Sequence, residues 1–194
     1  RWGVPRLVEE VVFPLSQWRI RAVVDGRGDV LAVWTHAQPG FGLPSAMRSA
    51  RFGKAAASWS APREIARSTH LDVHRVASNA AGDAVVLWSA QGAPRAHRFD
   101  ATSRTWASSP TLLLDAPGLS SKLAGGIDRA GTIHVLAQTL VKKAGGIEQQ
   151  IWASRLEPPY TAWQRAERVD EPDRGEVSRM RAAVGAEGRV LVFW

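Results

Sequence analysis

Cysteine is absent from the 194-residue sequence, which excludes disulfide bonds and thiolate metal sites. No run of about 18 apolar residues occurs, so we expect no membrane-spanning helix. No charged-then-apolar signal region opens the sequence, and no stretch has helical periodicity. The sequence also lacks a phosphate loop, a Gly-x-Ser-x-Gly motif and a His-Glu-x-x-His motif. These absences exclude several familiar enzyme classes and favour a β-rich chain.

The charge balance is basic, with a formal net charge of +7 that comes almost entirely from arginine. Arginine favours planar anions such as carboxylate and phosphate, although an even excess of arginine is also a common compositional bias. The nine tryptophans fall largely at repeat positions, and no basic-aromatic strip stands out. We therefore expect no nucleic-acid partner.

A hairpin motif occurs four times along the chain. Its anchoring glycines are separated by 54, 49 and 57 residues: Gly28, Gly82, Gly131 and Gly188. Three residues before these glycines stand Asp25, Asn79, Asp128 and Gly185, and six residues after them stand Trp34, Trp88, Ala137 and Trp194. Asp or Asn at the first corner and Gly at the fourth is typical of a type I turn followed by a left-handed residue. The short apolar run after each turn predicts a strand that is buried on both faces.

A second block follows the first three hairpins at constant offsets. Each copy has a small-x-Arg-apolar stretch, then a tryptophan, then an aliphatic residue. The arginines are Arg51, Arg98 and Arg155, the tryptophans are Trp59, Trp106 and Trp163, and the aliphatic residues are Ile65, Leu112 and Val169. We interpret the three arginines as architectural and expect each guanidinium to lie over a nearby tryptophan. Length variation is confined to residues 35–48, 89–95 and 138–150, which we expect to be loops.

Four short strands in a repeat of about 50 residues predict an all-β fold, a β-propeller. The chain would be one propeller portion spanning residues 1–194, with blade repeats at 19–66, 73–114 and 122–170 and partial blades at 1–10 and 179–194. First strands are expected at 19–24, 74–78, 122–127 and 179–184. Because open sheet edges are unfavourable, we expect further blades from the same or another chain. A β-sandwich is the weaker alternative, since it needs no such register.

The main candidate site is a row of basic residues at the start of the first strands, which would face one mouth of a central channel: Arg19, Arg21, Arg75, Lys122, Arg179 and Arg181. Converging cations there would bind a carboxylate, sulfate or phosphate group. In the alternative interpretation these side chains pair with acidic neighbours between blades, namely Glu9, Glu10, Asp72, Asp173 and Glu176.

A weaker candidate is a metal site at His70, Asp72 and His74, which would share one face if residues 70–74 were extended. The ordinary interpretation is a loop entering a strand, with hydrogen-bonded histidines. We predict no bound metal and no cofactor.

The Asp-x-x-Gly…Trp hairpin, the Arg-Phe block and the second tryptophan resemble tandem propeller repeats of bacterial secreted and cell-surface proteins, some of them sialidase-like or lectin-like. The sialidase Asp-box lies in the outer hairpin of a blade, whereas Asp25–Gly28 belongs to the inner one. The sialidase Tyr/Glu nucleophile pair also has no match, because the single tyrosine, Tyr160, lies in a Pro-Pro-Tyr loop.

The resemblance thus implies an extracytoplasmic bacterial protein. We expect a non-catalytic recognition or scaffolding module that binds a glycan or a protein through its variable loops and basic channel mouth. One alternative is a sialidase-like glycoside hydrolase, or a lyase acting on acidic polysaccharide. Another is a structural subunit completed by another chain.

Overall fold

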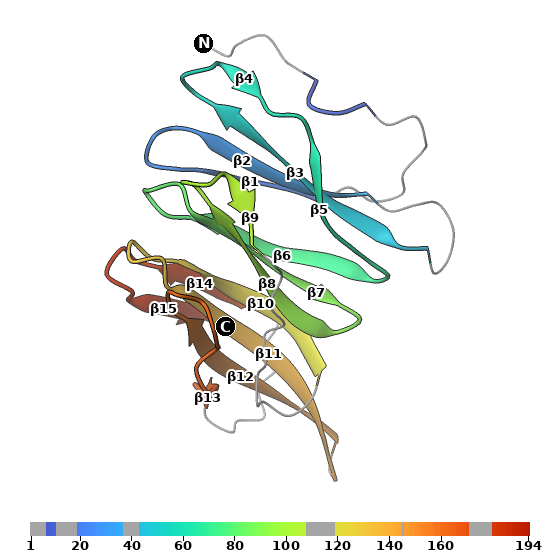
Figure 1. Cartoon of the computed structure of the whole chain (residues 1–194). Coiled ribbons are helices and arrows are strands. Elements are labelled where there is room, and N and C mark those ends of the chain that lie inside the picture. The colour runs from blue at the N-terminus through green and yellow to red at the C-terminus, as the bar shows by residue number, and fades with distance from the viewer. Residues whose placement is uncertain (1–6, 11–18, 37–42, 108–118, 145, 171–179) are drawn as a thin grey trace.

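The computed structural model describes residues 7–10, 19–36, 43–107, 119–144, 146–170 and 180–194. Every regular element among them is a β-strand, which confirms the all-β prediction for this part of the chain. A membrane-spanning helix is likewise not found in these residues. All strand pairs are antiparallel, and the strands form several sheets that follow one another along the chain (Figure 1).

The sheets are called first to fourth in chain order. The first contains β1 (Ile20–Val24), β2 (Val30–His36), β3 (Ser45–Gly53), β4 (Ser58–Trp59) and β5 (Arg63–Ser68), with β4 and β5 both paired to β3. The second contains β6 (Leu71–Ser78), β7 (Ala84–Ala90), β8 (Ala93–Asp100) and β9 (Thr105–Trp106). The third contains β10 (Leu119–Ile127), β11 (Ile133–Lys143), β12 (Gly146–Leu156) and β13 (Glu167–Arg168). The fourth contains β14 (Arg181–Val184) and β15 (Val190–Phe193).

The predicted turn is present in the first hairpin of each sheet. The glycine N–H donates to the carbonyl three residues earlier in all four copies: Gly28 to Asp25 at 3.0 Å, Gly82 to Asn79 at 3.2 Å, Gly131 to Asp128 at 3.2 Å and Gly188 to Gly185 at 3.1 Å. The glycine φ angles are positive, between 75° and 93°. This backbone region favours glycine because it has no Cβ. The four turns therefore share one geometry, although the first corner is Asp, Asn, Asp and Gly.

The core lies between successive sheets. All seven residues of β7 are buried: Val86 and Trp88 pack in a cluster with Leu31 and Val33 of the first sheet, whereas Val85 and Leu87 pack in a cluster with the third. For β7 this confirms the prediction of a strand buried on both faces, whereas the prediction is wrong for β15, where Leu191 is 58% and Phe193 60% exposed. Burial on both sides explains why β7 contains no charged residue.

Two of the expected loops are mostly strand. Only Gln91 and Gly92 separate β7 from β8, and both have positive φ, as a tight hairpin turn requires. Residues 138–150 extend β11 and β12 to a tip at Lys143 and Gly146, so the extra length there is added strand pairing rather than a loop. Residues 37–42 of the remaining variable segment lie outside the described part of the chain.

The predicted fourth strands are shorter than expected. In the first sheet Pro62, which has no N–H to donate, lies between β4 and β5. β9 and β13 have two residues each, and Leu112 lies outside the described residues. Residues 7–10, expected to lie in a partial blade at 1–10, form no strand; instead Val8 packs against Ala32, Trp34 and Ala50 of the first sheet.

We predict that Gly82→Ala lowers the free energy of unfolding by about 1–3 kcal/mol, because a left-handed backbone with a Cβ is strained. The added Cβ would also lie 2.7 Å from Asp25 Oδ2. Gly53→Ala is the matched control, because its Cβ would meet nothing closer than 3.7 Å. Urea unfolding measures both variants, and equal effects at the two positions would contradict the role given to the turn.

Candidate functional site

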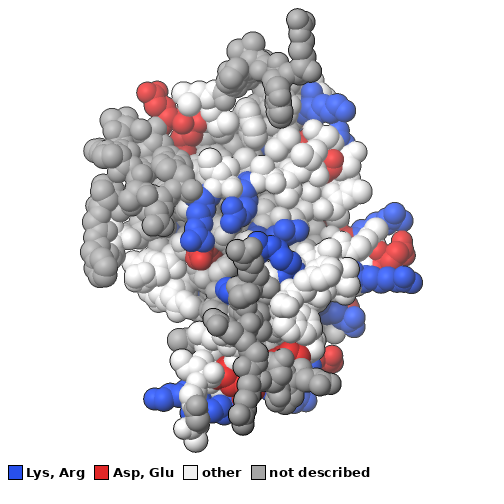
Figure 2. Space-filling model, turned by 180° about the vertical axis from the view of Figure 1, so that it is seen from behind, with Lys and Arg blue, Asp and Glu red and all other residues white. Residues whose placement is uncertain are grey.

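The first strands of the four sheets line a common groove. β1, β6, β10 and the beginning of β14 enclose a cavity of about 580 Å³, to which Arg21, Arg75 and Arg181 all contribute. A second cavity of about 270 Å³ lies among the same four strands and shares Val23 and Arg75 with the first. Viewed from behind, the molecule shows several Lys and Arg side chains near the middle of the visible surface (Figure 2).

Identical strand register brings the three arginines to equivalent places. Each stands seven residues before its turn glycine and opposite the residue five after it: Arg21 opposite Val33, Arg75 opposite Leu87, and Arg181 opposite Phe193. The corresponding residue of the third sheet is Ala124, opposite Leu136. The first, second and fourth sheets therefore each contribute an arginine to the groove, whereas the third sheet contributes the methyl group of an alanine.

The three groove arginines, Arg21, Arg75 and Arg181, have no ion pair within the described residues. All three are exposed. Among the described residues, Arg21 Nη1 and Arg181 Nη1 donate to the backbone carbonyls of Ile20 and Met180, each at 3.4 Å. Guanidinium groups that are not neutralised by nearby carboxylates can form charge-assisted hydrogen bonds with an anion.

The other predicted basic residues differ from these three. Arg19 Nη1 lies 2.5 Å from Asp72 Oδ1 of β6. Arg19 therefore fits the alternative interpretation, in which the basic residues pair with acidic residues of a neighbouring sheet. Lys122 is half-buried in β10 beside a register shift between Ser120 and Lys122. Arg179, Asp173 and Glu176 lie outside the described residues.

Residues 70–74 are not extended throughout, which removes the geometry on which a metal site depended. His70 lies in a turn with φ of 55°, ahead of β6. The pairing of β6 with β7 shifts between Val73 and Arg75, so His74 occupies a bulge. His74 Nε2 lies 3.0 Å from Ser89 Oγ, and Asp72 pairs with Arg19. Among the described residues no group of three potential metal ligands occurs.

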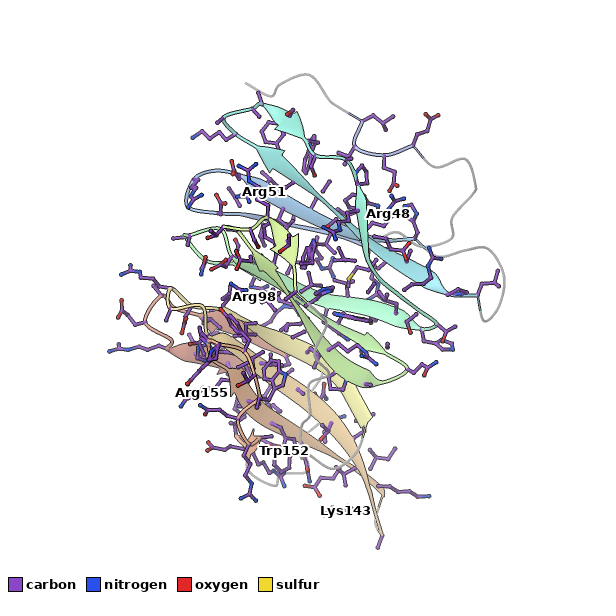
Figure 3. The ribbon with its side chains drawn as sticks, in the orientation of Figure 1. Arg48, Arg51, Arg98, Lys143, Trp152 and Arg155 are labelled. Atoms are coloured by element: carbon purple, nitrogen blue, oxygen red, sulfur yellow. The ribbon has the colours of Figure 1, made fainter. Side chains whose placement is uncertain are left out.

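Arg51, Arg98 and Arg155 occupy corresponding places in three successive sheets (Figure 3). Arg51 Nη2 lies 2.9 Å from Asp29 Oδ2 and Arg98 Nη2 lies 3.6 Å from Asp83 Oδ1, so the first two arginines bind the acid that follows the turn glycine. The expectation that these guanidinium groups lie over tryptophan is wrong. Arg51 lies over Phe99 and Arg98 over Tyr160, each supplied by the next sheet. Sequence spacing within one repeat does not reveal a contact between repeats.

The carboxyl groups with shifted pKa are unsuited to act as general acids. Four have a lowered pKa, each mainly because of a hydrogen bond: Asp29 from the Lys54 N–H, Glu64 from Arg67, Asp100 from the Ser103 N–H, and Glu148 from Gln150. A general acid at neutral pH needs a raised pKa. No carboxylate is among the described residues that line the groove.

Comparison with known proteins extends only to solved structures, because no protein-family model and no curated protein matches the chain. The chain is similar to a luciferin-regenerating enzyme with a TM-score of 0.47 and 12% identity, over 87% of this chain and 50% of that one. It is also similar to a puromycin hydrolase S511A mutant complexed with PGG, with a TM-score of 0.35 and 12% identity, over 88% of this chain and 32% of that one. Both are β-propeller-type folds. The described residues form several antiparallel sheets with no helix, and these two structural neighbours are propeller-like.

Burial lowers the pKa of His74 below its ordinary value of 6.5; Asp72 opposes this shift, and Arg19 and Arg21 add to it. As the pH is lowered, His74 therefore takes up its proton at a higher pH in the unfolded chain, near 6.5, than in the folded chain. We predict that unfolding free energy decreases as the pH is lowered from about 7 to about 5, and that His74→Gln weakens this dependence. His70→Asn, in the exposed turn, is the control. Denaturant unfolding at each pH measures the effect, and an unchanged slope in His74→Gln would contradict it.

Proposed function

We propose that the chain is a portion of a β-propeller that acts as a non-catalytic recognition module. The groove would bind a carboxylate or sulfate group displayed by a glycan or protein partner. One observation carries this proposal: Arg21, Arg75 and Arg181 come from three different sheets, line one groove, and have no ion pair among the described residues. Three guanidinium groups around one cavity favour an anion with several acceptor oxygens.

The propeller assignment is supported by the order of the sheets. β1 contacts β6, β6 contacts β10, and β10 contacts β14, so the first strands follow one another around the groove. In a propeller the first strands of the blades surround a central channel in this way. The repeats at 19–66, 73–114 and 122–170 would then be blades, and 179–194 the first half of another.

The groove supports recognition better than a sialidase-like hydrolase or a polysaccharide lyase. Glycoside hydrolysis uses a pair of carboxyl groups on either side of the scissile bond. Among the described residues, the groove offers arginines, a histidine and apolar side chains instead. Tyr160 lies away from the groove, where it packs with the second and third sheets.

We predict that replacing Arg21, Arg75 and Arg181 together by glutamine raises the Kd for sulfated dextran by about tenfold or more. A variant with Arg27, Arg63 and Arg165 changed to glutamine has the same net charge and changes exposed arginines that lie outside the groove. Affinity electrophoresis in sulfated and neutral dextran compares the two variants with the wild type.

The melting temperature of each variant completes the test. Because the three groove arginines have no ion pair among the described residues, we expect the groove variant to melt within a few degrees of the wild type. Equal loss of binding in both variants would show a net-charge effect only. Unchanged binding with a much lower melting temperature would show that the groove arginines are structural.

A further inference from the structure

A cavity of about 490 Å³ lies between the first and second sheets. Leu31, Ser49 and Arg51 of the first sheet line one side of it, and Phe99 and Trp106 of the second sheet line the other. Each of these sheets has at least four described strands, so the cavity is bounded on both sides by complete strand pairs. Its volume is within the range of sites that bind small molecules.

The residues on the first-sheet side of the cavity have counterparts in the second sheet that contact a tyrosine. Strand pairing matches Leu31 with Val85, Ser49 with Ala96, and Arg51 with Arg98. Tyr160, which follows β12 of the third sheet, packs against the cluster that contains Val85 and Ala96. The Arg98 Cζ lies 4.3 Å from the centre of the Tyr160 ring. In the first sheet the matching residues line an open cavity instead.

The second sheet has no ring at the position that corresponds to Tyr160. Tyr160 stands three residues before Trp163, and Ser103 stands three residues before Trp106. Ser103 is exposed, and its hydroxyl oxygen lies 2.7 Å from Thr105 Oγ1 in the same turn. The place that a tyrosine takes between the second and third sheets is therefore left open between the first and second.

Arg51 is held in a way that suits a ring better than an anion. Its Nη2 lies 3.1 Å from Asp25 Oδ2 and 2.9 Å from Asp29 Oδ2, so two carboxylates balance its charge and fix its position. The planar face of a guanidinium group stacks on aromatic rings. Arg51 makes one such contact already, since its Cζ lies 5.6 Å from the centre of the Phe99 ring.

The rim of the cavity is cationic. Arg63 and Arg104 both line the cavity and are exposed, and neither has an ion pair among the described residues. Asp29 also lines the cavity, but its carboxylate already accepts hydrogen bonds from Arg51 and from the Lys54 N–H. The two rim arginines can therefore form charge-assisted hydrogen bonds with an acidic group of a ligand.

We propose that this cavity binds a small aromatic carboxylate. The ring of the ligand lies against Arg51, Phe99 and Trp106, and its carboxylate pairs with Arg63 or Arg104. This site shares no residue with the basic groove, so the proposal does not depend on the function proposed for the groove.

Three compounds test the proposal. 4-Hydroxyphenylacetate has both the ring and the charge, 4-hydroxyphenylacetamide lacks the charge, and cyclohexylacetate lacks the aromatic ring. Trp106 Nε1 donates to Ser49 Oγ at 3.0 Å, so the indole N–H signal of Trp106 in an NMR titration of the intact chain reports on the cavity. Trp106→Phe assigns that signal. We expect 4-hydroxyphenylacetate to bind with a Kd of about 1 mM, and each of the other compounds to bind about fivefold more weakly or worse.

Charge variants test the role of the rim. We expect Arg63→Gln/Arg104→Gln to lose the preference for the acid over its amide and to keep the preference for the aromatic ring over cyclohexane. Arg27→Gln/Arg165→Gln is the matched control, because it has the same net charge and changes exposed arginines that do not line the cavity. The control should keep both preferences.

A filled cavity tests the location of the site. Ala61 is exposed and lines the cavity, so Ala61→Trp should abolish binding without disturbing the core. Ala162→Trp, at an exposed position of the third sheet that does not line the cavity, should bind the acid as the wild type does.

The proposal is overturned if 4-hydroxyphenylacetate at about 10 mM leaves the Trp106 signal unchanged, or if cyclohexylacetate binds as tightly. It is also overturned if Arg63→Gln/Arg104→Gln keeps the preference for the acid, or if Ala61→Trp binds like the wild type. Loss of the response in the variant of the three groove arginines, with Ala61→Trp unaffected, would place the ligand in the basic groove and overturn it as well.

Discussion

The glycine turn that begins each sheet is the constraint on which the arrangement of the sheets depends. Each turn reverses the chain and also contacts the turn of the next sheet. A Cβ at Gly82 would lie 2.7 Å from Asp25 Oδ2, so the two turns meet only because that glycine has no side chain. Asn79 Nδ2 donates to the Asp128 carbonyl at 3.0 Å, which joins the second and third turns. The turns thus set both the register within each sheet and the spacing between sheets.

The basic groove is a consequence of this spacing. Once the turns are aligned, the residues seven positions before each glycine lie at one level of the first strands. In the second sheet, the apolar strand β7 that follows the turn is buried against both neighbouring sheets. Apolar packing between sheets supplies the stability, since β7 is buried along its whole length. Arg21, Arg75 and Arg181 have no ion pair with the described residues, which is why we propose that they bind an external anion.

The features that recur within each repeat could be predicted from the sequence, whereas the contacts between neighbouring repeats could not. The spacing of Gly28 and its counterparts predicted the turns, the strand order and the alignment of the arginines, because these depend on local backbone geometry. The aromatic partner of Arg51 could not be predicted, since Phe99 belongs to the next sheet. The bulge at His74 was also missed, because the apolar pattern of a strand does not show where its pairing shifts.

Backbone geometry that repeats while the side-chain charge changes is also seen beside the turn glycine. The position after the turn glycine keeps its backbone conformation in every sheet, yet its side chain changes from an acceptor in Asp29 and Asp83 to a donor in Arg189. In the first two sheets the complement of that side chain is supplied by the same sheet. In the fourth sheet no described strand supplies it. The basic groove differs because its cations come from separate sheets, and only a ligand that reaches several first strands at once can use them.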